Sequence, residues 1–455
     1  MSQAPRKLDR KLGRTARGVA WYVLERVERD RAFADLALHA ALRDSTLGRR
    51  DRALATELCY GTLRLRGRLD AALAMSVDRS LGRVEPRVLS LLRLGAYQIL
   101  QLRGPRNASA VDESVKLARS RGLERAAGFV NAVLRALARR AEAGDLAYPD
   151  PSLDPAGYLR DWGSLPEWLA DRWLSQFGLA EATALAEACT RPPPRCVRVS
   201  PGVDRDEVVR RLGGRPGRYA PAAVTALARD PVGDPGFAAG ELTVQDEASQ
   251  LVPLLLGAEP GDTVVDCCAA PGTKAVQLAQ QVGPKGEVIA LELRARRLPL
   301  IYRAASRLRL ENLRVLQRDA AKGFDLQGRM RFARILVDAP CSGLGTLRRN
   351  PDARWHLAPE EVSRAAERSL ALLVSCARYV ESGGALVYSV CTFTPEETSG
   401  VVGRFLERHA DFKQEDARDH LPKGAGELVD RTGALATFPH RHGCDGFFAV
   451  RLTRT

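Results

Sequence analysis

The pattern of apolar positions divides the chain into a helical part and a part in which strands and helices alternate. Across residues 14–140, apolar side chains recur at the spacing of amphipathic helices, as at Val19, Val23 and Val27. No run of β-forming residues interrupts this stretch. The pattern therefore predicts an all-α first domain, which we place at residues 1–145.

From residue 246 onward, short apolar runs of strand length alternate with helical stretches. The predicted strands lie at 263–267, 287–291, 313–316, 335–337 and 385–390, and the predicted helices at 273–281, 295–308 and 360–380. Alternation of this kind is typical of a doubly wound, mostly parallel sheet. We expect such an α/β domain at residues 245–455.

The middle of the chain predicts a third, smaller unit. Residues 141–160 are acidic and contain three prolines, as linkers often do. A short strand at 196–199, a helix at 204–212 and a weaker apolar run at 222–227 follow. This order predicts a small α/β module at residues 160–244.

The charges are distributed unevenly along the chain. Residues 1–140 hold 29 basic and 14 acidic side chains, whereas the remainder holds 40 and 41. A basic excess confined to the first third indicates a nucleic acid or another polyanion as partner. The alternative is ordinary solvated helix faces in a chain that favours arginine, since only 8 of 69 basic residues are lysine. That preference explains arginine over lysine but not the shortage of acids.

Several classes of protein are disfavoured by the composition. The nine cysteines form no C-x-x-C pair and no cluster with histidine, so we expect no structural zinc. No run reaches the ~18 apolar residues of a membrane span, and the amino terminus has no apolar stretch, so we expect a cytoplasmic protein without a membrane partner. Cys267, Cys376 and Cys444 are interpreted as packing thiols.

Acidic residues follow two of the first three predicted strands. The first strand runs into Asp-Cys-Cys-Ala-Ala-Pro-Gly-Thr-Lys at 266–274, whose small residues let a cofactor approach the backbone. This is neither a dinucleotide fingerprint nor a Walker loop. Glu292 and Asp319, after the second and third strands, are placed for ribose hydroxyls and an adenine amino group. Each acid alone could be a solvated loop carboxylate, but together they favour a nucleoside cofactor without phosphates.

Two later strands deliver thiols to the same edge of the predicted sheet. The strand at 335–337 leads into Asp338 and Cys341, and the strand at 385–390 leads into Cys391. Parallel neighbours end at one edge, so we expect two thiols and an acid around one site. The alternative is a buried strand with an inert cysteine after it.

These motifs resemble one known family over essentially the whole chain. Residues 268–274, 338–343 and 388–397 are similar to the cofactor and cysteine motifs of the bacterial RNA 5-methylcytosine methyltransferases of the RsmB/Sun (Fmu) type, and residues 245–249, 348–355 and 445–448 also look familial. The helical first domain is similar to the RNA-binding fold of the antitermination factor NusB. The implied fold is multidomain, with an all-α NusB-like domain, a ferredoxin- or RRM-like α/β module and an α/β Rossmann-like class I methyltransferase domain.

The resemblance also implies a role for each site residue. It makes Cys391 the nucleophile that adds to C6 of cytosine, Cys341 an aid to product release, Asp338 a contact to N3 and Lys274 a support of the site. The cofactor would be S-adenosyl-L-methionine. Its implied binding residues are Cys268, Ala269, Ala270, Pro271, Gly272, Thr273, Lys274, Glu292, Arg297, Asp319 and Asp338.

The implied reaction is methylation of 16S rRNA at the RsmB-type site, cytosine 967, by a monomer that needs no metal and acts on naked RNA or an early assembly intermediate. Another ribosomal or transfer RNA site is one alternative, and a non-catalytic NusB-like RNA-binding factor is another. Methylation of an exocyclic amino group would call for an N/D-P-P-Y motif, and Asp-Ala-Pro-Cys stands at 338–341 instead.

Three positions depart from the family's pattern. Thr273 stands where a second glycine is usual, Glu292 where aspartate is usual, and Val390 where threonine precedes the nucleophile. We expect Thr273 to cap the following helix and Glu292 still to reach a ribose. Val390 removes a hydroxyl contact beside Cys391.

Overall fold

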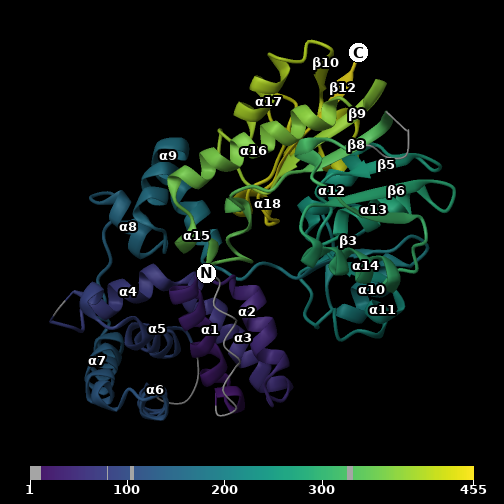
Figure 1. The fold of residues 1–455 in the computed structure, drawn as a ribbon. Coiled ribbons are helices and arrows are strands. Elements are labelled where there is room, and N and C mark those ends of the chain that lie inside the picture. Colours follow the sequence, from purple (N-terminus) through teal and green to yellow (C-terminus); the bar gives the residue numbers. More distant parts are fainter. Residues whose placement is uncertain (1–11, 79, 103–106, 325–330) are drawn as a thin grey trace. The chain divides into compact units, whose positions relative to one another are not determined.

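The computed structural model describes residues 12–78, 80–102, 107–324 and 331–455. The expectation about the extreme amino terminus therefore lies outside the described residues. The chain forms two compact units, a helical unit of residues 1–192 with 347–356, and an α/β unit of residues 193–346 with 357–455 (Figure 1). No helix among the described residues is long and apolar enough to cross a membrane.

The helical unit confirms the prediction of an all-α first domain. Its helices are α1 Ala16–Asp30, α2 Ala34–Arg43, α3 Arg49–Arg64, α4 Arg66–Ala74, α5 Pro86–Gln101, α6 Asn107–Ser120, α7 Glu124–Ala143, α8 Pro155–Asp161, α9 Glu167–Cys189 and α15 Ala353–His356. Thr15 caps α1 by accepting the Gly18 amide at 3.0 Å. Val19, Val23 and Val27 are buried in the common core, as their helical spacing predicts.

The helical unit contains a segment from the second half of the chain, residues 347–356. Arg354 is fully buried and donates to the carbonyls of Ser164, Cys189 and Leu347 at 3.1, 3.0 and 3.2 Å. Burial lowers the pKa of Arg354 to about 10. The Trp355 indole donates to the Leu63 carbonyl at 2.9 Å. The segment is therefore an integral part of the helical unit, which its sequence did not reveal.

The predicted small module has a sheet of its own. Its elements are β1 Cys196–Val199, α10 Arg205–Leu212, β2 Arg215–Pro216, β3 Ala223–Thr225, α11 Pro235–Ala239 and β4 Leu242–Val244. The strands pair antiparallel in the order β2-β3-β1-β4. This sheet shares one compact unit with the large sheet. The three domain ranges given by the sequence stay a prediction.

The large sheet is mostly parallel. Its strands are β5 Thr263–Asp266, β6 Glu287–Glu292, β7 Leu313–Gln317, β8 Phe332–Asp338, β9 Val380–Val390, β10 Phe412–Glu415, β11 Leu435–Ala436 and β12 Phe448–Arg454. The order is β10-β12-β9-β8-β5-β6-β7, and β11 pairs with β12. The five predicted strands are parallel to one another, whereas β12 is antiparallel to β9 and to β10.

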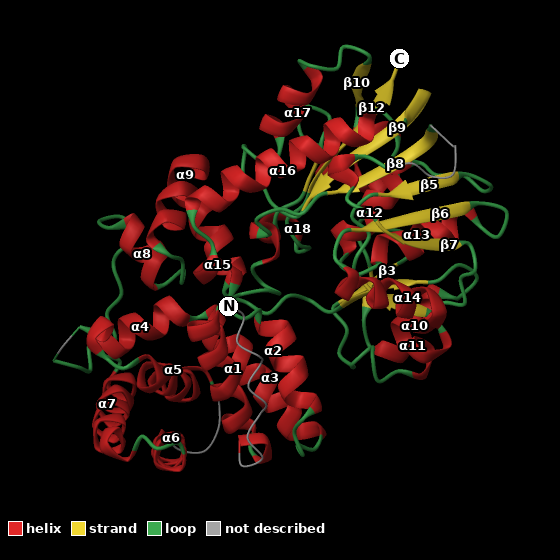
Figure 2. Ribbon diagram, viewed as in Figure 1, coloured by secondary structure: helices red, strands yellow, loops and turns green. Residues whose placement is uncertain are grey.

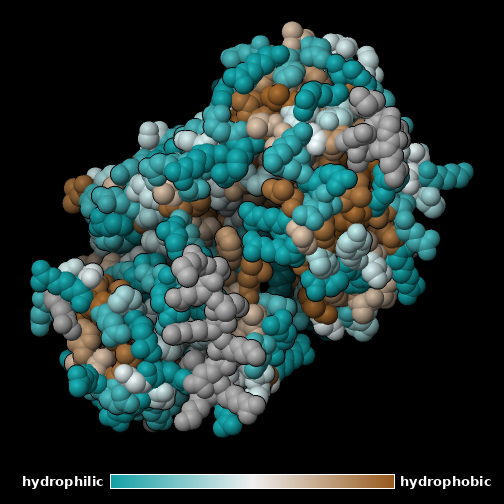
Figure 3. Space-filling view, in the orientation of Figure 1, coloured by the Kyte–Doolittle hydropathy of each residue, from teal (hydrophilic) through white to brown (hydrophobic). Residues whose placement is uncertain are grey.

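Helices cover both faces of this sheet, as the alternation of elements predicts (Figure 2). They are α12 Glu247–Leu256, α13 Thr273–Val282, α14 Leu298–Arg307, α16 Pro359–Ala377 and α17 Ser399–Leu406; the short helix α18 Pro439–His442 follows β11 in the chain. Successive strand residues face opposite sides, so Ile335 packs in the core with α16 and α17, and Leu336 in the core with α12 and α13. On the face seen in Figure 3, hydrophilic residues cover much of both units.

Candidate active site

The structure brings the two predicted thiols together at the carboxyl edge of the sheet. Strands β8 and β9 are parallel neighbours, with Asp338 opposite Ser389 in the register. Cys341 and Cys391 follow these strands, and their Sγ atoms lie 3.3 Å apart. Both cysteines are partly exposed. The contact with Cys391 and burial raise the pKa of the Cys341 thiol well above its ordinary value, and the carboxylate of Glu397 adds to the shift.

Lys274 and Asp338 form an ion pair beside these thiols. Lys274 is the second residue of α13, and its Nζ lies 2.7 Å from Asp338 Oδ2, while the Ser389 hydroxyl donates to Asp338 Oδ1 at 2.7 Å. Burial acts to lower the pKa of Lys274, but the Asp338 carboxylate, with a smaller effect of Cys391, raises it above the ordinary value. The Lys274 ammonium also stands 5.1 Å from the centre of the Phe447 ring. Lys274 is therefore a cation at the site, and its partners hold it there.

Asp266 is a site residue that the sequence reasoning did not select. It ends β5, is 1% exposed, and accepts the Cys268 amide through Oδ1 at 3.4 Å. Its Oδ2 is buried without a hydrogen-bond partner among the described residues. Burial, and then the carboxylate of Asp338, raise the pKa of Asp266 to about 7. Its position at the tip of the first strand was the available signal.

The loop between β5 and α13 is built for close backbone approach. Gly272 has a φ of 110°, and a Cβ there would lie 3.1 Å from the Ile301 Cα. The Ala269 amide donates to the Leu291 carbonyl at 3.0 Å, which ties the loop to β6. The expectation that Thr273 caps the helix was wrong. Gly272 occupies the N-cap position without a side-chain bond, and Thr273 is the first residue of α13.

The two other strand-tip acids are oriented by the turns that follow them. Glu292 is buried at the end of β6, accepts the Arg294 amide at 2.8 Å and lies 3.3 Å from the Arg297 guanidinium. Arg297 in turn donates to the Ala270 carbonyl at 2.9 Å, so it joins the two loops. Asp319 follows β7 and accepts the Ala321 amide at 3.1 Å. All three acids therefore belong to neighbouring strands at the same edge.

The loop after Cys341 is packed tightly against its surroundings. The Gly345 amide donates to the Cys391 carbonyl, and the Gly446 amide donates to the Gly345 carbonyl, at 2.9 and 2.8 Å. A Cβ at Gly345 would lie 2.0 Å from the Gly446 carbonyl oxygen. Only glycine fits there. Val390 is buried at the end of β9 opposite Phe448, while the hydroxyl of Thr392 lies 3.0 Å from that of Ser342.

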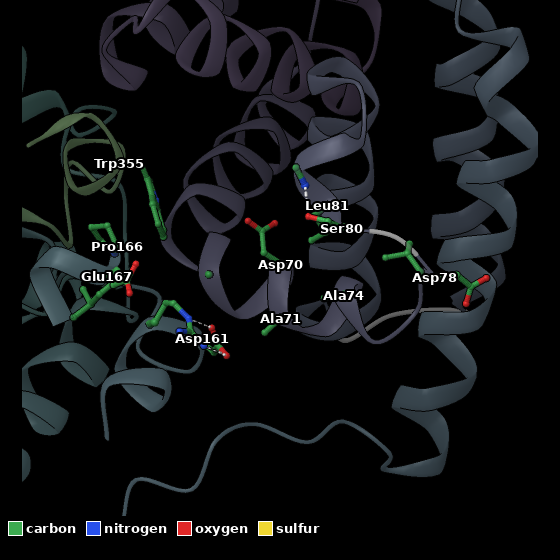
Figure 4. A pocket seen from close by; sticks show the side chains of 15 residues that line it. Asp70, Ala71, Ala74, Asp78, Ser80, Leu81, Asp161, Pro166, Glu167 and Trp355 are labelled. Carbon is green, nitrogen blue, oxygen red and sulfur yellow. Dashed lines mark hydrogen bonds and ion pairs between the residues drawn. The ribbon is translucent and has the colours of Figure 1, made fainter. Parts of the chain in front are cut away.

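A cavity of about 730 Å³ lies elsewhere, within the helical unit (Figure 4). Asp70, Asp161, Glu167 and Trp355 contribute to its lining. Asp161 is already paired with Arg160 at 2.8 Å. None of the predicted site residues lines the cavity, so it is no part of the candidate active site. Among the described residues, no group of His, Cys, Asp and Glu could hold a metal ion.

Comparison with known proteins shows the family of this chain. A model described as "16S rRNA methyltransferase RsmB/F" matches residues 253–453, and the NusB family model matches residues 14–139. The "Probable ribosomal RNA small subunit methyltransferase B" of Bacillus subtilis is 35% identical over 447 residues, 97% of this chain and 99% of that protein. This chain belongs to the RsmB/F family of 16S rRNA methyltransferases.

Two further comparisons agree with this result. The "Ribosomal RNA small subunit methyltransferase B" of Thermus thermophilus is 38% identical over 448 residues, 97% of this chain and 98% of that protein. The crystal structure of PH0851 has a TM-score of 0.75 at 22% identity and covers 96% of this chain and 99% of its own, which shows a shared fold. As an RsmB/F family member, the protein is an S-adenosylmethionine-dependent RNA methyltransferase with a NusB-like helical domain.

The residues present fit S-adenosylmethionine. The cofactor carries a positive sulfonium, an amino group and ribose hydroxyls, all of which favour carboxylates. Asp266 keeps a buried carboxylate oxygen without a hydrogen-bond partner among the described residues, and Glu292 and Asp319 stand on the neighbouring strands. A Cβ at Gly272 would be crowded against the Ile301 backbone, so the loop presents backbone at this position. The donor set is thus acidic where a dinucleotide site would cradle phosphates.

Proposed function

We propose that the protein methylates C5 of a cytosine in 16S rRNA, at the RsmB-type site cytosine 967, through a covalent adduct with Cys391. The observation that carries this proposal is the 3.3 Å contact between the Sγ atoms of Cys391 and Cys341. The contact lies at the edge of the sheet that also carries the ion pair of Asp338 and Lys274. A paired thiol site of this kind suits addition of one thiol and assistance by the other.

Covalent catalysis answers the low nucleophilicity of cytosine C5. The Cys391 thiolate adds at C6, forming the S–C6 bond and making C5 electron-rich. Asp338 accepts a hydrogen bond from protonated N3, and the proton on N3 favours the addition. When bound, S-adenosylmethionine supplies an electrophilic methyl group to C5. The ammonium of Lys274, which interacts electrostatically with Cys391, lies on the side of the attacking group.

Product release reverses the addition. The C5 proton leaves to a base, the C6–S bond breaks, and its electron pair returns to the Cys391 sulfur. Cys341 keeps its proton because its pKa is raised well above the ordinary value. It can therefore donate a hydrogen bond to the departing sulfur, from which it stands 3.3 Å away. This assigns nucleophilic attack and release to two different thiols.

The helical unit supplies the surface for RNA. Arg49 and Arg50, at the start of α3, are exposed and belong to the basic excess of residues 1–140. Such side chains contact phosphates, and the target base must be unstacked to reach Cys391, so we propose a single-stranded or loop region of naked or early-assembly RNA.

The double substitution Arg49→Gln with Arg50→Gln should flatten the salt dependence of RNA binding. An unchanged slope would show that these two residues are not part of the RNA-binding surface. We propose that the enzyme works in the cytoplasm as a monomer.

The test is transfer of labelled methyl groups to 16S rRNA, with transfer RNA and 23S rRNA as competing substrates. Cys391→Ala should abolish turnover and any covalent protein–RNA adduct, whereas Cys341→Ala should accumulate the adduct. Mapping the product should find 5-methylcytosine at position 967. An adduct that survives in Cys391→Ala would overturn the assignment of the nucleophile, and label in transfer RNA alone would overturn the substrate.

A further inference from the structure

A buried carboxylate that the proposed mechanism does not use connects the two cysteine loops. Glu397 is 0% exposed and follows Cys391 in the chain. It accepts the amide of Ser342 at 2.6 Å and the hydroxyl of Ser342 at 2.5 Å, and Ser342 is the residue after Cys341. Its third donor is the hydroxyl of Thr394, at 2.7 Å. All of these donors lie in the loops that carry the thiols.

The arrangement is unusual because nothing cationic balances the carboxylate. Among the described residues, Glu397 forms no ion pair within 4.0 Å, and its charge is met by one amide and two hydroxyls. A buried carboxylate without a counter-charge is destabilising unless hydrogen bonds satisfy it. The Tyr388 hydroxyl also donates to the backbone carbonyl of Glu397 at 2.6 Å, which fixes the turn that presents the side chain. The fold therefore holds this group in one place.

We propose that Glu397 is a positioning residue for product release, gripping Ser342 so that Cys341 is held against Cys391. The inference rests on the proposed roles of the two thiols. Without the carboxylate, the Ser342 amide loses its acceptor, and the Ser342 hydroxyl keeps only the hydroxyl of Thr392 at 3.0 Å. Gly345 still ties the far end of the Cys341 loop to the Cys391 carbonyl, so the loop stays folded. Its first residue, Cys341, becomes free to move away from the thiol that it serves.

The position of Glu397 also separates the two thiols electrostatically. The carboxylate lies on the Cys341 side and contributes to the raised pKa of that thiol. Lys274 interacts with Cys391 instead. The Cys341 thiol is thereby kept protonated, whereas Cys391 interacts with the Lys274 cation. The expected consequence of removing Glu397 is a defect in release rather than in attack.

The experiment compares adduct formation with turnover in the full-length protein, using 16S rRNA and S-adenosylmethionine. Glu397→Ala should form the Cys391–RNA adduct at nearly the rate of the parent, while multiple turnover falls roughly 10- to 100-fold, as expected for a small misplacement of a reacting group. Glu397→Gln keeps an acceptor for the Ser342 amide and should retain an intermediate turnover. Ser342→Ala removes only the hydroxyl and should shift the balance in the same direction by less.

A double-mutant cycle decides between positioning and general stabilisation. In a Cys341→Ala background, Glu397→Ala should cause no further loss of turnover, because the thiol that it positions is gone. Glu407→Gln, an exposed residue after α17, is the matched control and should behave as the parent. Melting temperatures of all variants are recorded. If Glu397→Ala does not fold, Glu397→Gln and Ser342→Ala carry the same comparison.

Equal losses of adduct formation and turnover in Glu397→Ala, or in both milder variants, would overturn the inference. So would a further loss in the Cys341→Ala background equal to that in the parent. Failure of the proposed function looks different, because it shows as an adduct that persists in Cys391→Ala or as no adduct in the Cys341→Ala enzyme. The two failures therefore show in different variants of the same experiment.

Discussion

The α/β unit contains two pairs of cysteines whose Sγ atoms are equally close. Cys341 and Cys391 are 3.3 Å apart, and so are Cys267 and Cys376. The second pair joins the end of β5 to α16 and is fully buried in an apolar core that includes Val265. The first pair is partly exposed at the edge of the sheet. Proximity of two thiols therefore does not by itself mark a reactive site.

The surroundings make the difference. Burial, the hydrogen bond with Cys376 and the charge of that thiol raise the pKa of Cys267 well above its ordinary value. Cys341 has a raised pKa as well, but its partner Cys391 faces the ammonium of Lys274. Reactive cysteines lie in partly exposed, electropositive places, whereas buried structural ones are inert. The two pairs thus differ in their exposure and in the interaction of the Lys274 ammonium with Cys391.

The largest difference is expected in alkylation. In the folded protein, iodoacetamide should modify Cys391 faster than Cys267 or Cys376 by on the order of 10³-fold, because the buried pair reacts only when the core opens. Peptide mass spectrometry after timed quenching measures each rate. Adding urea should abolish the difference and serves as the control. Similar rates for both pairs in the native state would break the comparison.

The buried carboxyl group of Asp266, at the end of β5, should make the stability of the protein depend on pH. The pKa of Asp266 rises from 3.8 to about 7 in the fold, so the native state favours the protonated form. The resulting destabilisation is absent below pH 4, grows between pH 4 and pH 7, and is complete above pH 7. Asp266→Asn should therefore match the parent at pH 4 and exceed its stability at pH 8 by up to about 4 kcal/mol.

Urea unfolding of the α/β unit at the two pH values measures this effect. The exposed Asp419 offers a control, because Asp419→Asn should change stability little at either pH. A stability difference between Asp266→Asn and the parent that stays constant from pH 4 to pH 8 would contradict the assigned cause.

The smallest effect is expected from the inert pair. Cys376→Ala should reduce the free energy of unfolding by about 1–2 kcal/mol through the loss of a buried sulfur, with turnover within about twofold of the parent. Methyl transfer and thermal melting on the same preparation check both parts. Turnover as low as that of Cys341→Ala would show that the buried thiols also take part in the reaction.

The elements with a clear apolar period were predictable, and those fixed by tertiary contacts were not. The helices of residues 14–140 and the five parallel strands follow from periodicity alone. Strand β12 was missed because Arg451 interrupts its apolar run; in the fold that side chain pairs with Glu415 at 2.8 Å. Asp338, Cys341 and Cys391 could be placed together because parallel strands share an edge.

Asp266 and Glu397 escaped sequence reasoning for a common reason. From sequence alone, an aspartate or glutamate is expected at the surface. Its burial depends on hydrogen-bond donors that come from other loops. The amide and hydroxyl of Ser342 are 55 positions from Glu397. Arg354 presents the same problem with opposite charge, since its acceptors are the carbonyls of Ser164, Cys189 and Leu347.

The segment 347–356 has a consequence for how this protein can be divided, in the laboratory or by evolution. The polypeptide leaves the helical unit, later returns to contribute Arg354, and leaves again. A gene fragment for residues 1–192 would encode a unit that lacks the Arg354 guanidinium. A fragment starting at residue 193 would keep Arg354 and Leu347 but lose the carbonyls of Ser164 and Cys189. A single nick near residue 193 should leave the two pieces associated. The helical unit is thus discontinuous in the chain and is not an appendage that recombination could exchange in one cut.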